Sequence, residues 1–151
     1  MFLLGVAMAE YLKRKSGNGD LWQMLEDEVY RPIGIHHAAI NRTIERDGSK
    51  GQPLMAYGYY PTLSDIAKIA TLYQNKGRHG DDQILYAPMI EKMLAGADDR
   101  GLPTGSANAY GGQRYFMSLW NSRYSASDTC KLYLPAAIGW AGTSLHSCQM
   151  A

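Results

Sequence analysis

The most informative segment of the sequence is Ala56-Tyr57-Gly58-Tyr59-Tyr60-Pro61-Thr62-Leu63-Ser64-Asp65-Ile66-Ala67-Lys68-Ile69-Ala70, which is followed by Asn75-Lys76-Gly77. Its aromatic beginning, which contains a glycine, predicts an extended segment. Thr62 then caps a helix, with an acid three residues later at Asp65. Gly77 is expected to end this helix. Apolar residues at helical spacing predict its buried stripe, which consists of Ile66, Ile69, Ala70 and Tyr73.

Two helices are predicted before this stretch. The first covers about residues 2–15, and Gly17 is a candidate left-handed cap behind it. We expect it to be a core helix with an apolar face of Leu3, Leu4, Ala7 and Tyr11. The second begins at Asp20, with Gln23 at the capping-box position, and ends before Pro32. Residues 34–54 show no periodicity, which predicts a long loop.

The last part of the chain changes from a helical pattern to strand-forming sequence. A fourth helix is expected from Pro88 to Gly96, with apolar residues Met89, Ile90, Met93 and Leu94. Residues 115–120 and 131–134 are aromatic and rich in strand-forming types, and residues 137–140 could form a third strand. We therefore predict one α+β domain over residues 1–151, mainly helical in 1–96, with the strands of an incomplete antiparallel sheet in 113–151.

Composition excludes several classes of protein. The chain has 151 residues and a formal net charge of +1, so neither a basic nucleic-acid surface nor an acidic tail is indicated. No apolar run reaches the roughly 20 residues of a membrane-spanning helix, although a short anchor at residues 1–9 is an alternative to a core helix. Cys130 and Cys148 could pair, but with only two cysteines we expect free thiols. No cofactor is predicted.

Four segments, in order, resemble the penicillin-recognising serine hydrolases, a family that includes class C β-lactamases, DD-peptidases and esterases. They are residues 1–10, the segment from Asp20 to Ile35, the segment from Tyr57 to Gly77, and residues 80–93. The resemblance implies a partial β-lactamase/transpeptidase-like fold. It also implies a periplasmic or secreted protein that acts on an amide or ester, although the sequence itself leaves the compartment unknown.

The family's chemistry needs a serine followed three residues later by a lysine, and a nearby tyrosine. No serine here has a lysine at that spacing, and Ser64 is four residues before Lys68, as Ser127 is before Lys131. We therefore expect the nucleophile, lysine and tyrosine upstream of Met1, and no catalytic residue in this chain. Two short matches, residues 73–75 and 106–108, are interpreted as coincidences.

A third family motif lines the pocket from an edge strand. The resemblance implies Trp140, Ala141 and Gly142 as substrate-binding residues at that strand, and the alternative is a turn with a buried tryptophan. The sequence after Gly142 departs from the family pattern. His36 and His37 are adjacent, but they and the cysteines have no ligand spacing, so no metal site is predicted.

These observations lead to one expected function and one alternative. The chain is expected to be a C-terminal fragment of a serine hydrolase of the β-lactamase, DD-peptidase or esterase type, inactive by itself. The alternative is a degenerate, non-catalytic module that binds a peptide or a protein partner. In either case an open sheet edge or the apolar face of the first helix offers a surface for self-association.

Overall fold

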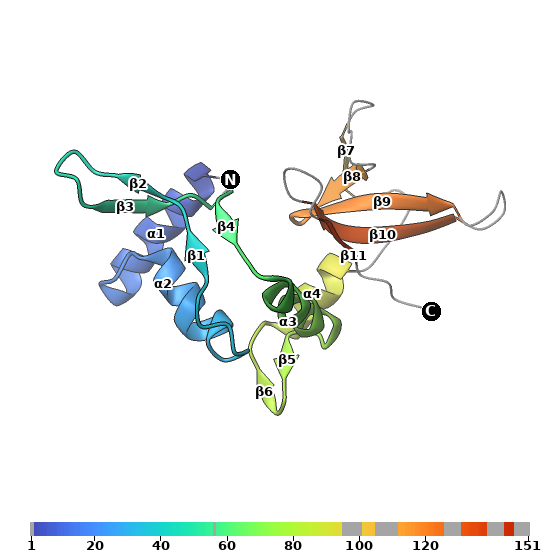
Figure 1. Ribbon diagram of the computed structural model, residues 1–151. Helices are drawn as coiled ribbons and strands as arrows, with labels where there is room; N and C mark the ends of the chain where they lie inside the picture. The colour runs from blue at the N-terminus through green and yellow to red at the C-terminus, as the bar shows by residue number, and fades with distance from the viewer. Residues whose placement is uncertain are drawn as a thin grey trace. The chain divides into compact units, whose positions relative to one another are not determined.

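The computed structural model describes residues 2–55, 57–94, 101–104, 112–125, 131–138 and 144–146. The chain divides into two compact units, Met1–Ile69 and Ala70–Ala151, each of which is described by itself. Helices and small antiparallel sheets occur together (Figure 1), which confirms the α+β class in general terms. Among the described residues, no helix is both long and apolar enough to cross a bilayer.

Helix α1 spans Phe2–Ser16 and ends as predicted. Gly17 has a φ of +80°, and its N–H donates to the carbonyl of Lys13 over 2.9 Å. Since only glycine adopts this conformation without steric cost, the left-handed cap is confirmed.

The buried face of α1 differs from the predicted one. Gly5 and Ala9 are its buried residues, whereas the side chains expected in the core are exposed, with 80% of Leu3 and 64% of Tyr11 accessible. A Cβ atom on Gly5 would lie 2.7 Å from Cγ of Met55. The small residues therefore allow another segment to approach the helix closely, and the large apolar residues are left on the opposite side.

Helix α2, Leu21–Leu25, begins at Asp20, whose carboxylate accepts from the amides of Trp22 (3.1 Å) and Gln23 (3.2 Å). The predicted capping box is only half formed, because the Gln23 side chain donates to Asp27 instead of turning back. The helix continues as a π-helix, η1, over Glu26–Tyr30, which the sequence pattern did not predict.

The predicted loop at residues 34–54 contains strands. These are β1 (Ala39–Ile40), β2 (Arg42–Ile44) and β3 (Lys50–Pro53), and β2 and β3 form an antiparallel hairpin. Its turn is held by Asp47, whose carboxylate accepts from the Ser49 amide over 2.9 Å. Strand β1 pairs with β4 (Tyr59–Tyr60). The loop prediction was wrong here because strands this short, with Lys, Gly and Pro, carry little propensity of their own.

Helix α3 spans Leu63–Gln74 and begins with a complete capping box. The amide of Thr62 donates to the Asp65 carboxylate over 2.9 Å, and the Asp65 amide donates to the Thr62 hydroxyl oxygen over 3.1 Å. Gly77 follows the helix with a φ of +83°. Leu72 is the most buried residue of α3, and the residues of the predicted stripe are half-buried.

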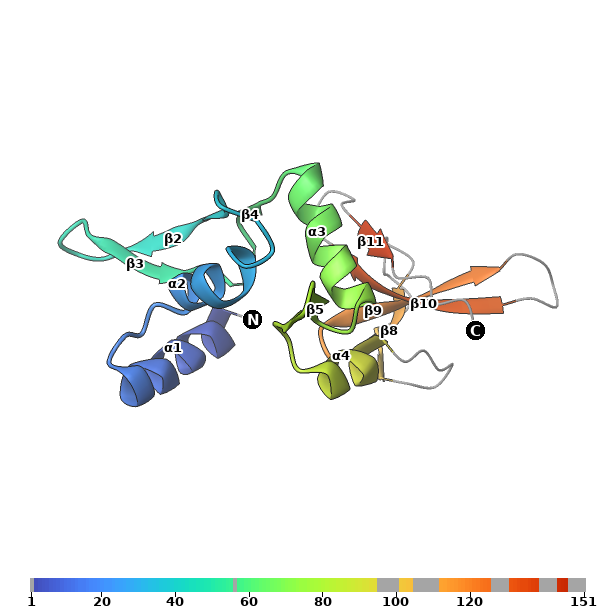
Figure 2. The ribbon, with the colours of Figure 1, turned by 90° about the horizontal axis from the view of Figure 1, so that it is seen from below.

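The second unit begins with the last part of α3, which is followed by the two-stranded pair β5 (Arg78–His79) and β6 (Asp82–Gln83). Helix α4, Ala87–Leu94, buries Ile90 and Leu94, and its predicted end at Gly96 lies outside the described residues. Figure 2 shows β10 beside β9, in agreement with their pairing register.

A five-stranded antiparallel sheet completes this unit, in the order β11-β10-β9-β8-β7. Residues 115–120 are not one strand, because Met117 and Ser118, with φ values of +46° and +68°, make a hairpin turn. Such positive values suit the turns that match strand twist. The strands are β7 (Leu102–Pro103), β8 (Gly112–Phe116), β9 (Leu119–Ser125), β10 (Lys131–Ile138) and β11 (Ser144–His146).

Candidate functional site

The substrate-binding residues implied by the family resemblance, Trp140, Ala141 and Gly142, lie outside the described residues. The strands on either side are described: β10 ends at Ile138, which pairs with Ser144 at the start of β11. The assignment of these three residues to a pocket stays a prediction.

The aromatic beginning of the segment from Tyr57 to Gly77, which resembles the family, lies in the first unit and completes a cluster of three aromatic rings. Tyr59, from β4, stacks on Tyr30 with ring centroids 5.7 Å apart and an interplanar angle of 10°. Both rings also contact the ring of Trp22 in a tilted arrangement. The centroid of the Trp22 ring lies 5.3 Å from that of Tyr30 and 5.4 Å from that of Tyr59. Such ring pairs contribute about 0.5–1.5 kcal/mol beyond the area that they bury.

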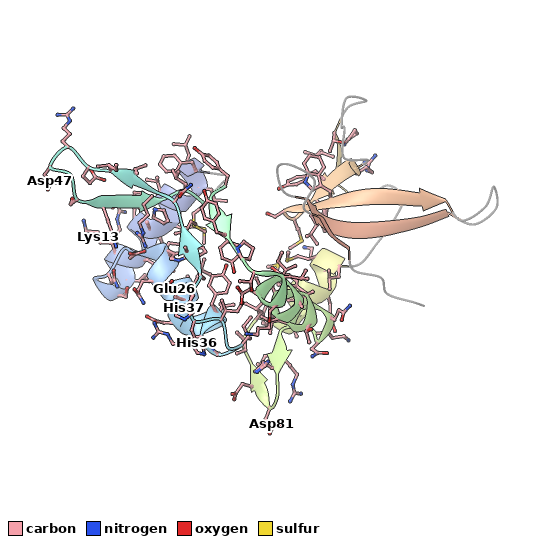
Figure 3. All side chains as sticks on the ribbon, in the orientation of Figure 1. Lys13, Glu26, His36, His37, Asp47 and Asp81 are labelled. Carbon is pink, nitrogen blue, oxygen red and sulfur yellow. The ribbon has the colours of Figure 1, made fainter. Side chains whose placement is uncertain are left out.

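Trp22 has its polar group satisfied within this cluster. Its indole Nε1 donates to the carbonyl of Ala38 over 3.1 Å and to the carboxylate of Glu26 over 3.2 Å, and Glu26 is labelled in Figure 3. The cluster therefore joins α2, η1, the residue that precedes β1, and β4 within the first unit.

Tyr59 is the exception, because its hydroxyl is buried without a hydrogen-bond partner among the described residues. Burial raises the pKa of Tyr59 to about 12, and the nearby negative charge of Asp65 acts in the same direction. The phenol is therefore protonated at physiological pH. Because the proton-accepting phenolate is scarcely populated at this pH, Tyr59 is unsuited to act as a general base.

The first turns of α3 place three polar side chains together. Asp65 is occupied by the capping box, and the hydrogen bonds from the Thr62 amide and hydroxyl hold the pKa of this carboxyl below its usual range, with smaller contributions from Lys68 and His37. The ammonium of Lys68 donates to the carbonyl of Gly34 over 2.6 Å. These groups make structural contacts within the chain.

Ser64 and Lys68, which have the wrong spacing for the family's reactive pair, are not hydrogen-bonded to one another in the described structure. Ser64 is exposed in the first turn of α3, while the Lys68 ammonium faces Gly34. A serine without a base within hydrogen-bond reach remains a weak nucleophile. The geometry therefore gives no activated serine at this position.

The two short matches to family motifs are residues 73–75 and 106–108. Tyr73 is half-buried near the end of α3, where burial raises its pKa, and Asn75 follows the helix. Residues 106–108 lie outside the described residues. His36 and His37 are exposed (Figure 3), and no group of three or more His, Cys, Asp or Glu side chains suited to a metal occurs in the described part of the chain.

Comparisons of the chain with protein-family models, with curated proteins and with solved structures give no match.

Proposed function

We propose that this chain is the scaffold portion of a serine hydrolase of the penicillin-recognising type, with a partial β-lactamase/transpeptidase-like fold. The complete enzyme acts on an amide or ester bond through an acyl-enzyme. Its serine, lysine and tyrosine lie outside these 151 residues, and the chain by itself transfers no acyl group. In the complete enzyme, residues 140–142 line the substrate pocket.

One observation carries this proposal: the polar residues of the segment most like the family are used for structure. Thr62 and Asp65 cap α3, and Lys68 ties the helix to Gly34. Gly58, with a φ of +94°, and Gly77, with a φ of +83°, occupy conformations that favour glycine. A segment whose characteristic residues set backbone geometry is what a scaffold requires, with the reactive groups supplied elsewhere.

Turnover of nitrocefin and of p-nitrophenyl acetate tests the predicted inactivity, together with labelling by a fluorophosphonate probe. The purified chain should hydrolyse both substrates no faster than its Ser64→Ala variant, and mass spectrometry should find no labelled serine. Labelling of one particular serine, with turnover that is lost when that serine is replaced, would overturn the claim of inactivity.

The family assignment has a separate test in the DNA that precedes the Met1 codon. A continuous reading frame that encodes Ser-x-x-Lys and then Tyr-x-Asn would support it. An upstream frame that encodes a different kind of domain would contradict it, whatever the outcome of the turnover assays.

A second function is favoured by the exposed face of α1. Leu3, Leu4, Met8 and Tyr11 are 80%, 55%, 45% and 64% exposed, and they share one side of the helix. An apolar patch of this kind marks a partner surface or an aggregation hazard. A non-catalytic binding module would be a monodisperse monomer with a cooperative melt, whereas a portion of a larger enzyme would aggregate, and light scattering separates the two.

A further inference from the structure

The first unit contains a polar hollow that the proposed hydrolase does not use. It has a volume of about 280 Å³ and lies between the second half of α1, the residues that precede α2, and the hairpin β2–β3. Lys13, which is labelled in Figure 3, comes from α1, whereas Arg42 and Lys50 come from the hairpin. The hollow is near the lower end of the volumes of small-molecule sites.

Its floor is a charge pair. Nη2 of Arg42 lies 2.9 Å from each carboxylate oxygen of Asp20, and Nη1 donates to the carbonyl of Gly51 over 3.3 Å. The Asp20 carboxylate also caps α2, so both side chains are held in place. Because these two charges neutralise one another, the floor is polar but carries no net charge.

Two glycines in the lining of the hollow allow neighbouring groups to approach the backbone closely. A Cβ on Gly19 would lie 3.1 Å from the carbonyl oxygen of Ala9, and a Cβ on Gly51 would lie 2.5 Å from Oε1 of Glu45. Residue 51 has no room for a side chain, because the hydroxyl oxygen of Thr43 lies nearer still and the Glu45 carboxylate lies close to the backbone of β3.

The rim carries four further charges, two of each sign: Lys13 and Lys50, and Glu10 and Glu45. All four side chains belong to exposed residues, and within the described part of the chain no ion pair includes any of them. A simple anion would be attracted by the two lysines but repelled by the two carboxylates. A simple cation would be attracted by the carboxylates but repelled by the lysines. A small molecule with both charges can satisfy both pairs.

We propose that this hollow binds a small zwitterion of the amino-acid or dipeptide class. The ligand's carboxylate lies toward Lys13 and Lys50, and its ammonium toward Glu45 and Glu10. The inference is independent of the proposed hydrolase, since it uses none of the family's motifs. It requires only the arrangement of α1 and the hairpin around the Arg42–Asp20 pair.

Titration of the isotope-labelled chain with alanylalanine, followed by amide NMR, tests the proposal. The amides of Gly19, Gly51 and Gln52 should shift and saturate. Lys50→Gln and Glu45→Gln should each weaken binding at least tenfold. Lys15→Gln and Glu28→Gln, which replace exposed charges away from the hollow, should leave the affinity unchanged.

Sodium acetate and ethylammonium chloride are the matched single-charge probes. Neither should produce saturable shifts at these amides. The proposal fails if alanylalanine gives no saturable shift up to tens of millimolar, if either single-charge probe binds as tightly, or if the two control variants weaken binding as much as Lys50→Gln does.

Discussion

The ammonium nitrogen of Lys68 lies 2.6 Å from the carbonyl oxygen of Gly34, and this hydrogen bond joins residues 34 positions apart. Gly34 has a φ of +76° in the turn that follows η1. The contact therefore ties the beginning of α3 to the end of the second helical segment. It is one of the few polar links in the first unit that are not local in sequence.

Replacing Lys68 with methionine removes the charge but retains most of the length of the side chain. We expect Lys68→Met to lower the free energy of unfolding of the first unit by about 1–2 kcal/mol, because it leaves a partly buried carbonyl without its charged donor. Lys15→Met, at an exposed position on α1, should cost no more than about 0.5 kcal/mol. Amide hydrogen exchange in residues 2–69 measures both, and equal effects would show that the Lys68 contact does not stabilise the unit.

The ionised carboxylate of Asp20 makes the free energy of unfolding depend on pH in the acid range. Burial raises the pKa of Asp20, but hydrogen bonds from Arg42 and from the Gln23 and Trp22 amides outweigh it, so the pKa lies below its ordinary value of 3.8. The folded state then binds fewer protons than the unfolded state, and the stabilisation is complete above pH 3.8 and is lost as the pH falls through the lower, folded-state pKa. We expect Asp20→Asn to cost about 1–2 kcal/mol at neutral pH and less at low pH. Urea unfolding at a series of pH values checks this, and a constant difference between the two proteins would contradict it.

The hydroxyl of Tyr59 is buried and has no partner among the described residues, so its removal should not weaken the fold. We expect Tyr59→Phe to leave the free energy of unfolding unchanged or to raise it by up to about 1 kcal/mol. The ordinary pKa of 10.0 is raised to about 12, so the wild type should lose stability as the pH rises from 10 toward 12, and the variant should not show this component. Denaturant melts at neutral and alkaline pH test both statements. A neutral-pH loss of more than about 1 kcal/mol would mean that the hydroxyl is bonded after all.

Gly77 follows α3, and Gly80, in the turn between β5 and β6, is a matched control for it. Both have a positive φ, +83° and +60°, but a Cβ on Gly77 would lie 2.5 Å from the carbonyl oxygen of Leu85, whereas nothing lies within 4 Å of a Cβ on Gly80. We expect Gly80→Ala to cost about 1–2 kcal/mol for the backbone conformation alone. Gly77→Ala should lower the free energy of unfolding by at least about 1 kcal/mol more, because its Cβ would clash with the carbonyl oxygen of Leu85. Thermal melts compare them, and similar losses would show that the Leu85 contact is not a constraint.

The caps of α1 and α3 could be predicted because they depend on hydrogen bonds between residues that are close in sequence. Thr62 and Asp65 are three residues apart, and each satisfies an amide of the other, so the start of α3 needs no distant partner. Gly17 and Gly77 adopt left-handed conformations through bonds to the preceding turn. Where the capping signal failed, at Gln23, a competing local partner was present in Asp27.

The candidate site was less predictable, because its parts come from separate segments. Trp22, Tyr30 and Tyr59 meet through α2, η1 and β4, and no spacing rule links them. The hollow between α1 and the hairpin depends on strands that the sequence pattern did not reveal. The predicted pocket residues, Trp140, Ala141 and Gly142, remain a prediction.

The helix caps at Gly17, Asp20, Thr62 and Gly77 and the general α+β class could therefore be predicted from sequence. Which surfaces are covered depends instead on the packing of distant segments. In α1 the large residues Leu3 and Leu4 predict one buried face, but the close approach of Met55 to Gly5 buries the other. A cap depends on hydrogen bonds within a single turn, whereas burial depends on which distant segment lies against the helix.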